Sequence, residues 1–257
     1  MSYIISELHG QYGGKTAVAE QMILQSKFGG ADAVKVQLYS PDFDPKSLNH
    51  DNQGDFLSLT FDELKHLKEY ADMLHIDFFA SFFDEKRLEW CLKLNFPILK
   101  IANWVSLNER SLIEKAITTN KPVIMSINNE IISKEGKIFD APNIHYLYTE
   151  SSYPAVIEDL NIPDFNTSFV EGYSDHTPGV TAVAYALAHG AKIIEKHFTI
   201  DHSWQKTKEK GHIAAMDYVQ LQQIVGLARG MDILANKKIF QFESYEFPKK
   251  SGFPDHT

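Results

Sequence analysis

Gly172-Tyr173-Ser174-Asp175-His176-Thr177 and Glu195-Lys196-His197-Phe198-Thr199 are the two stretches that decide the fold of this chain. Each closes an apolar run with polar groups that include a histidine. His176 and His197 are 21 positions apart, about the length of one strand–helix–strand step. Both imidazoles are therefore expected at the same end of a parallel sheet, where they could share one metal ion.

The same alternation recurs along the whole chain. Eight apolar runs have the length of strands, and they span residues 3–8, 33–38, 78–81, 98–103, 122–127, 144–151, 168–175 and 191–198. Segments with helical spacing lie between most of them, at residues 16–28, 61–74, 85–94, 111–119 and 180–189. Continuous hydrophobicity is typical of parallel strands that are covered on both faces. A chain of 257 residues is close to the roughly 250 of a (β/α)8 TIM barrel, which is the fold that the pattern predicts.

Composition limits the class of protein. Hydrophobic residues make up 44% and charged residues 23%, and no apolar stretch approaches the roughly 20 residues of a membrane helix. The first strand begins within three residues of the N-terminus, and the lone Cys91 has no partner for an internal disulfide. We therefore expect a cytoplasmic protein without a membrane span. The net charge of −9 argues against a nucleic-acid partner.

Polar groups at the carboxyl ends of the predicted strands form the candidate site, because active sites of such barrels lie at that end. These groups are Glu7, Lys35, Gln37, Ser81, Lys100, Asn103, Ser126, Asn128, Ser151, Tyr153, Ser174, His176, Lys196 and His197. A lysine in an apolar strand needs an anion beside it, so Lys35 and Lys100 indicate a phosphate or carboxylate ligand. The alternative is a structural carboxylate, for which Asp32, Asp77 or Glu195 could serve.

These motifs resemble the N-acetylneuraminate (sialic acid) synthase family and its relatives that make legionaminic and pseudaminic acids. The two opening stretches, with Gly179 and Asp201, carry most of the resemblance, which covers roughly residues 3 to 235. Supporting strings are Ala31-Asp32-Ala33-Val34-Lys35-Val36-Gln37, Lys100-Ile101-Ala102, Lys121-Pro122-Val123-Ile124-Met125-Ser126 and Ser151-Ser152-Tyr153-Pro154-Ala155.

The resemblance implies a condensation of phosphoenolpyruvate with the aldehyde of an N-acylated hexosamine. It implies a divalent metal on His176 and His197, with manganese expected and magnesium or cobalt as alternatives. Phosphoenolpyruvate would be held by Lys35, Ser81, Lys100, Ser126, Ser151 and Ser174, and the sugar by Glu7, Gln37 and Tyr153. The catalytic residues implied are Glu7, Lys100, His176 and His197. The metal would polarise the aldehyde as a Lewis acid.

The chain departs from the family pattern at several positions. Gln11-Tyr12-Gly13-Gly14 replaces an Asn-His-Asn-Gly string, and Val105 replaces an acid that is a candidate for handling the water. Gly211 stands where the family has a sugar-binding aspartate, and Ser81 replaces a threonine. Most of these changes fall on the sugar side or on the water.

The architecture is expected to differ in two places. Residues 129–143 are too short for a full helix, which predicts a shortened fifth βα unit. The barrel would span residues 1–237, with a tail at 238–257 in place of the family's antifreeze-like domain. A homo-oligomer or a separate chain would then complete the site, and the loop at residues 201–212 is a candidate lid.

Two other functions fit the residues. One is a Schiff-base aldolase in which Lys100 or Lys196 is the nucleophile, to be tested by borohydride trapping. The other is a non-catalytic barrel that binds phosphoenolpyruvate or a similar anion without turnover.

Overall fold

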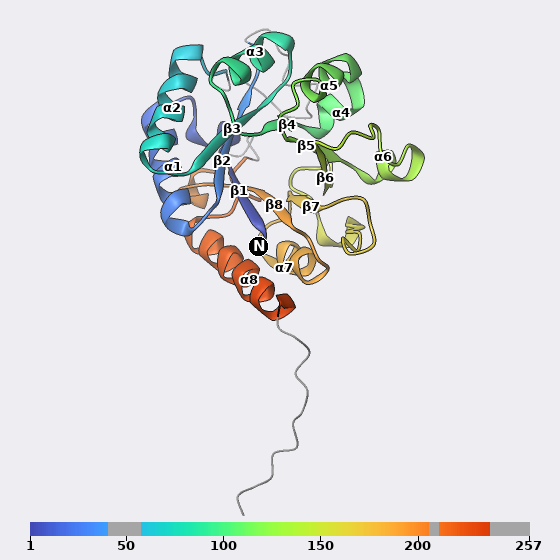
Figure 1. Cartoon of the computed structure of the whole chain (residues 1–257). Coiled ribbons are helices and arrows are strands. Elements are labelled where there is room, and N and C mark those ends of the chain that lie inside the picture. The colour runs from blue at the N-terminus through green and yellow to red at the C-terminus, as the bar shows by residue number, and fades with distance from the viewer. Residues whose placement is uncertain (41–57, 206–210, 237–257) are drawn as a thin grey trace, which may run out of the picture.

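Eight parallel strands close into a barrel in which each strand pairs with the next and β8 pairs with β1 (Figure 1). The computed structural model describes residues 1–40, 58–205 and 211–236. The strands are β1 (Tyr3–Glu7), β2 (Ala33–Leu38), β3 (Asp77–Phe82), β4 (Leu99–Ile101), β5 (Val123–Ile127), β6 (Ile144–Thr149), β7 (Gly172–Asp175) and β8 (Ile193–His197). The predicted (β/α)8 barrel is confirmed.

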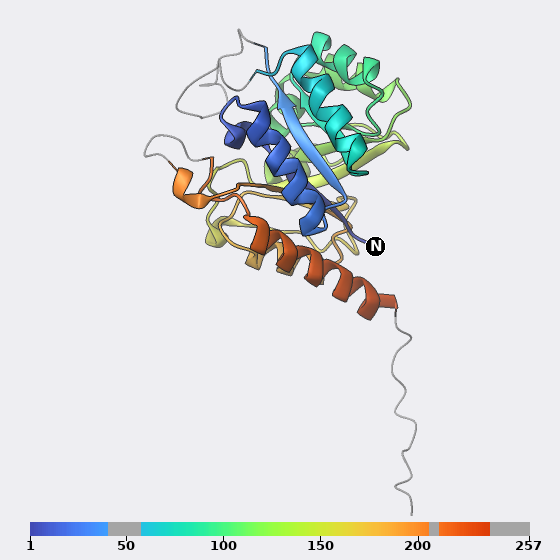
Figure 2. The same cartoon turned by 90° about the vertical axis from the view of Figure 1, so that its left-hand side faces the viewer.

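Helices surround this barrel and cover the outer face of its strands. They are α1 (Thr16–Gly29), α2 (Phe61–Met73), α3 (Glu85–Lys93), α4 (Asn103–Asn108), α5 (Arg110–Ile117), α6 (Asn129–Lys134), α7 (Thr181–Ala188) and α8 (Tyr218–Asn236). Figure 2 shows α1 and α8 packed side by side, which brings the two ends of the described barrel together. Of these helices, α4, α6 and α8 lie outside the five segments that the helical spacing predicts.

Most strand residues are apolar because the strands are buried on both faces. All five residues of β5 are buried, and in β2 the charged Lys35 lies among buried apolar residues. A strand buried this way cannot carry a charge without a partner, so each strand lysine must find one inside the barrel.

Two of the βα units have a shortened helical segment. Helix α6 has six residues, which confirms the shortened fifth unit. After β6 the described chain forms only a short 3₁₀ helix, Ile157–Asp159, where a regular barrel has an α-helix.

Strand β7 begins at Gly172, later than the predicted strand at 168–175. A side chain at Gly172 would lie 2.1 Å from the carbonyl oxygen of Ile193, so glycine permits the close approach of β7 to β8.

Helix α2 begins with a capping box. Thr60 accepts a hydrogen bond from the backbone N–H of Glu63 (3.2 Å), and the Glu63 carboxylate accepts one from the Thr60 N–H (2.8 Å). We expect Thr60→Ala to lower the free energy of unfolding by about 1 kcal/mol, because a helix donor loses its acceptor. Urea unfolding would measure this, with the exposed Thr181→Ala as control. An equal change in the two variants would contradict the capping role.

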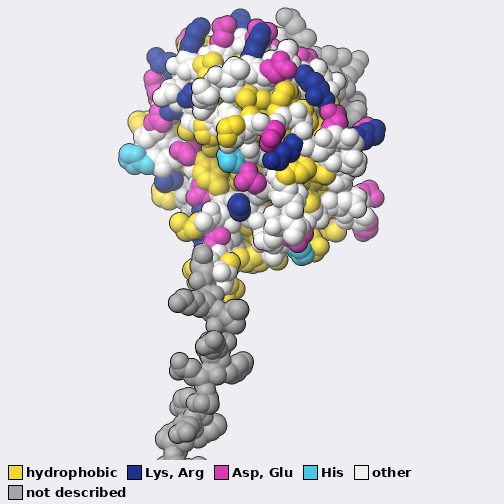
Figure 3. All heavy atoms as spheres, turned by 45° about the vertical axis from the view of Figure 1, so that its right-hand side comes forward, with side chains coloured by type: hydrophobic (Ala, Val, Ile, Leu, Met, Phe, Trp, Pro, Cys, Tyr) yellow, Lys and Arg dark blue, Asp and Glu magenta, His cyan; other side chains and the backbone are white. Residues whose placement is uncertain are grey.

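The surface carries both signs of charge. Figure 3 shows Lys and Arg side chains interspersed with Asp and Glu over one face of the molecule. No helix within the described residues combines the length and the apolar character that crossing a bilayer requires.

Candidate active site

Glu7, Lys35 and Ser81 lie on β1, β2 and β3 and meet inside the barrel. Parallel register places Glu7 beside Lys35, and the Lys35 ammonium forms an ion pair with the Glu7 carboxylate. The Lys35 Nζ also donates a hydrogen bond to Ser81 Oγ at 2.8 Å. All three side chains are buried. This group supplies one cation, one hydroxyl and one carboxyl group to the barrel interior.

Lys100 forms a second group with the neighbouring strands. Its Nζ donates to Ser126 Oγ at 2.7 Å and to the carbonyl oxygen of Ile101 at 3.0 Å. Lys100 and Ser126 lie on β4 and β5, which pair in parallel. The lysine is buried, so its charge also depends on the carboxylate described next.

Glu195 on β8 joins the two groups. One carboxylate oxygen lies 3.6 Å from Lys35 Nζ, and the other lies 3.7 Å from Lys100 Nζ. Ser174 on β7 donates to Glu195 at 2.9 Å. Two lysines and a carboxylate thus occupy the same buried space, an arrangement in which an anion could contact both ammonium groups.

Burial and charge act in opposite directions in this cluster. Burial disfavours the carboxylate of Glu195, but Lys100 and Lys35 outweigh burial and hold its pKa below the usual value. Burial lowers the pKa of Lys100 to about 8, although Glu195 opposes the shift. For Lys35, Glu195 and Glu7 overcome the effect of burial and raise the pKa.

The carboxyl group of Glu7 loses its proton less readily than that of an ordinary glutamate. Burial raises the pKa of its carboxyl group above the usual value, against the opposing attraction of Lys35. Its carboxyl oxygen accepts the N–H of His9 at 2.6 Å. When Glu7 holds a proton, the two lysines exceed the one ionised glutamate by one positive charge. The cluster then has a net positive charge, which favours the entry of an anionic ligand.

The two predicted metal ligands lie beside one another. The ring centroids of His176 and His197 are 5.5 Å apart, and the ring of Tyr153 lies 5.2 Å and 4.8 Å from them. Burial lowers the pKa of His176 below the usual value, so this imidazole is neutral at pH 7. Burial also raises the pKa of the Tyr153 hydroxyl, which stays protonated.

The hydrogen-bond partners of the two histidines determine which of their ring nitrogens could bind a metal. His176 Nδ1 lies 2.7 Å from the carbonyl oxygen of Glu150; a carbonyl only accepts, so Nδ1 donates and Nε2 keeps its lone pair. This is the arrangement of a metal-binding histidine held by its other nitrogen. His197 has the right position, but its Nδ1 faces the Gln11 side-chain amide at 3.1 Å. The described residues contain no group of three His, Cys, Asp or Glu side chains suited to a metal, so a cation here would rest on the two imidazoles.

The structure places the remaining predicted residues at the rim. Ser151 is exposed and accepts hydrogen bonds from the amides of Asn103 (3.1 Å) and Asn128 (3.0 Å). Gln37 accepts a hydrogen bond from the Tyr39 hydroxyl. Tyr153 donates to the carbonyl oxygen of Gly211 at 2.8 Å, which ties the candidate lid to the site. Residues 206–210 of that loop and the predicted tail at 238–257 lie outside the described residues.

The prediction that Lys196 reaches into this cluster is wrong. Its Nζ binds the carboxylate of Asp175 at 2.6 Å, and both side chains are fully buried. Successive side chains of a strand point to opposite faces, so Lys196 points away from Glu195 and His197, its neighbours on β8. Lys196 is therefore a structural cation, not a candidate nucleophile.

Glu195 and Gln11 are functional candidates that the sequence reasoning did not place in the site. Glu195 was considered only as a structural partner for a lysine, yet its position two residues before His197 gives it the same inward direction. Gln11 had no signal beyond its departure from the family pattern. Its contact with residues 197 and 211 depends on the folded loops.

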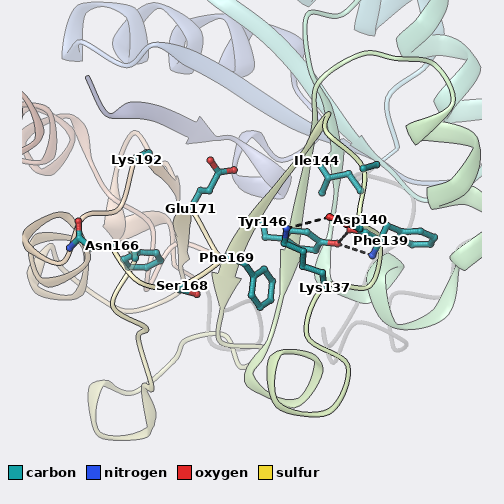
Figure 4. A pocket seen from close by; sticks show the side chains of 12 residues that line it. Lys137, Phe139, Asp140, Ile144, Tyr146, Asn166, Ser168, Phe169, Glu171 and Lys192 are labelled. Atoms are coloured by element: carbon teal, nitrogen blue, oxygen red, sulfur yellow. Dashed lines mark hydrogen bonds and ion pairs between the residues drawn. The ribbon is translucent and has the colours of Figure 1, made fainter.

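A separate cavity lies at the opposite end of the barrel. It has a volume of about 310 Å³, and its lining includes Ile144 at the start of β6, Glu171 before β7 and Lys192 before β8 (Figure 4). The Tyr146 hydroxyl anchors one wall by hydrogen bonds with the backbone N–H (2.9 Å) and carbonyl oxygen (2.8 Å) of Phe139. This cavity is distinct from the lysine cluster.

Comparison with known proteins gives consistent results. The model of the NeuB family matches residues 22–239. An uncharacterized protein of Methanocaldococcus jannaschii is 34% identical over 219 residues, which cover 79% of this chain and 64% of that protein. Human N-acetylneuraminate-9-phosphate synthase is 28% identical over 252 residues, covering 88% of this chain and 69% of the human protein. The chain thus spans about two thirds of the length of these relatives.

A solved structure supports the same placement. The N-acetylneuraminic acid (sialic acid) synthetase of Leptospira borgpetersenii, determined in complex with citrate, has a TM-score of 0.80 and 26% sequence identity to this chain. The match covers 95% of this chain and 88% of that one, so the similarity extends over the whole barrel.

Proposed function

Because this chain belongs to the NeuB family, we propose that it condenses phosphoenolpyruvate with the open-chain aldehyde of an N-acylated hexosamine. The products are a sialic-acid-like 2-keto sugar acid and phosphate. The human relative, whose name specifies N-acetylneuraminate 9-phosphate synthesis, supports this class of reaction. The panel assay below identifies the substrate sugar.

The observation that carries the proposal is the pair of buried lysines on β2 and β4. Lys35 and Lys100 each hold a serine hydroxyl, and both lie within 4 Å of Glu195. Phosphoenolpyruvate has a phosphate and a carboxylate on one small planar carbon frame. Two fixed cations with adjacent hydroxyl groups suit such a ligand, because charge-assisted hydrogen bonds to both anionic groups orient the enol carbon between them.

The reaction assigns a task to each group. Carbon 3 of the enol attacks the aldehyde carbon, a water adds at carbon 2, and phosphate leaves with its bridging oxygen. Glu7, whose pKa is raised by burial, can in its protonated form give a proton to the oxygen of the former aldehyde. Glu195 stays ionised and can accept the proton lost by the water. Val105 is buried in the core, so this role does not fall to an acid at position 105.

We also propose that His176 and His197 hold a divalent metal, with manganese as the first candidate. When bound, such a cation polarises the aldehyde oxygen and lowers the barrier to attack. Tyr153, which lies against both imidazoles, would form a wall of the sugar pocket. Gln37 at the end of β2 would contact the sugar hydroxyl groups.

A panel assay tests the proposal. Phosphate release from phosphoenolpyruvate would be measured with manganese and a series of N-acylated amino- and diamino-hexoses. We expect release that requires one class of sugar and falls when the metal is chelated. Tight binding of phosphoenolpyruvate without phosphate release under any sugar would contradict the proposal and select a non-catalytic anion-binding barrel.

The affinity for phosphoenolpyruvate is expected to fall as the pH rises above about 8. Lys100 has a pKa lowered to about 8, so it is cationic below that pH and loses its charge above it. The phosphate, with a second pKa near 6, is already ionised there and does not contribute to the change. Calorimetric titration between pH 7 and 9 would show the fall, which should be absent from Lys100→Met. An unchanged affinity in the unsubstituted protein would exclude Lys100 as a ligand cation.

The low pKa of Lys100 also favours a second candidate, a Schiff-base aldolase. A lysine that loses its proton near pH 8 is a better nucleophile than an ordinary lysine. Borohydride reduction in the presence of a keto-acid substrate would trap a covalent adduct on Lys100. The synthase proposal requires no such adduct.

A further inference from the structure

Gln11 connects two loops at the mouth of the barrel. It lies in the 3₁₀ helix His9–Tyr12 that follows β1, and its side chain is buried. Its amide nitrogen Nε2 is 2.6 Å from the carbonyl oxygen of Gly211, in the segment after β8. The same nitrogen is 3.1 Å from Nδ1 of His197. Gln11 and Gly211 are both positions at which the chain departs from the family pattern, and here they contact each other.

The contact with Gly211 fixes the direction of the Gln11 carboxamide. A backbone carbonyl oxygen only accepts, so the atom facing it at 2.6 Å must be the NH₂ group. The opposite orientation would place two oxygens at that distance. The same NH₂ group also hydrogen-bonds the Tyr153 side chain, and because it only donates, Nδ1 of His197 at 3.1 Å must be an acceptor. A neutral His197 therefore carries its proton on Nε2.

His176 has the opposite tautomer. Its Nδ1 donates to the carbonyl oxygen of Glu150, which leaves the lone pair on Nε2. The two imidazoles are neighbours, but they are not equally prepared for a cation. His176 is ready to ligate, while His197 is held by an amide donor.

His197 must lose its contact with the Gln11 amide before either of its ring nitrogens can bind a cation. Ligation through Nδ1 needs the lone pair that the Gln11 amide occupies. Ligation through Nε2 moves the proton to Nδ1, which would then face the hydrogens of an NH₂ group. The carboxamide must turn or withdraw in both cases.

A second observation concerns the side-chain carbonyl oxygen of Gln11. Its Oε1 is buried and has no hydrogen-bond partner within the described part of the chain. A buried carbonyl oxygen without a donor destabilises the arrangement that leaves it so. Movement of the carboxamide would relieve this cost, whereas the Glu150 contact of His176 carries no comparable penalty.

We infer that Gln11 is a positioning residue that controls whether His197 can bind a divalent cation, and that cation binding displaces its carboxamide from Nδ1. The inference rests on the metal site of the proposed function. It concerns a residue of this chain that touches one of the ligands and not the cation itself.

The first test is a manganese titration of the full chain followed by electron paramagnetic resonance, without phosphoenolpyruvate or sugar. We expect Gln11→Ala to bind manganese about three- to tenfold more tightly, which is the range that follows from the loss of one competing hydrogen bond. Gln25→Ala, the same change on α1, should bind as the unsubstituted protein does. Equal or weaker binding by Gln11→Ala would overturn the inference, as would the absence of manganese binding from both proteins.

The tautomer of His197 gives a readout that does not depend on the variant folding. Nitrogen-15 NMR of the metal-free protein should show His197 protonated on Nε2 and His176 protonated on Nδ1. Gln11→Glu, whose carboxylate only accepts, should shift His197 to the Nδ1 form. Protonation of His197 on Nδ1 in the unsubstituted protein would overturn the inference.

These outcomes are separable from failure of the proposed function. Turnover in the sugar panel together with manganese binding that Gln11→Ala leaves unchanged would retain the synthase and remove the role of Gln11. The expected tautomers of His176 and His197 and tighter manganese binding by Gln11→Ala, without turnover of any sugar, would retain the role of Gln11 and remove the synthase.

Discussion

Replacing Lys35 or Lys100 by methionine is expected to weaken phosphoenolpyruvate binding by about 30-fold or more. Each lysine is buried and holds a serine hydroxyl that faces the same space. Loss of one partner from a buried charge pair costs about 2 to 5 kcal/mol, and 1.4 kcal/mol is a factor of ten in affinity. Methionine keeps most of the chain length, so the change removes mainly the charge. Isothermal titration calorimetry would measure it.

The control for these variants is Lys115→Met. Lys115 is exposed on α5, where it pairs with Glu85, and its removal should leave the affinity unchanged. If both buried variants bound phosphoenolpyruvate as the unsubstituted protein does, Lys35 and Lys100 would be structural partners of Glu7 and Glu195, and the anion site would have to lie elsewhere.

Manganese binding is expected to disappear in His176→Ala and in His197→Ala. Within the described residues these imidazoles are not supported by a third protein ligand, so loss of either leaves one side chain to hold the cation. Only neutral imidazole binds a metal, and the pKa of His176 lies below its usual value. The affinity should therefore persist through pH 6.5 and fall at lower pH, as His176 gains a proton.

The exposed His66→Ala serves as the matched control for the two histidine variants. It should bind manganese normally, and circular dichroism should show that all three variants remain folded. Unchanged manganese affinity in the double variant His176→Ala, His197→Ala would place the metal elsewhere.

The barrel could be predicted because its strands are buried on both faces and read as continuous apolar runs. The first and last residues of each strand were harder to predict, since they depend on contacts between strands. β7 starts at Gly172, where its backbone approaches Ile193, and not at residue 168. Asn103 ends an apolar run, which predicts a strand position, but it begins α4 instead.

The site was predictable where a residue type was out of place in its strand. Lys35 and Lys100 stand among apolar residues, and the structure brings them to one carboxylate. Glu195 and Lys196 could not be separated by composition, because only the alternation along β8 decides which of them faces the cluster. Gln11 was not predictable as a partner of His197, since the two are 186 positions apart and meet through loops.

The most direct test of the central claim is to follow the carbon atoms of phosphoenolpyruvate. The protein would be incubated with manganese, uniformly carbon-13-labelled phosphoenolpyruvate and the sugar that the panel selects, and the products analysed by mass spectrometry. The account predicts a 2-keto sugar acid that contains every labelled carbon, with an equal amount of phosphate. Labelled pyruvate beside unchanged sugar would contradict it, because the cluster would then hydrolyse the phosphate without forming a carbon–carbon bond.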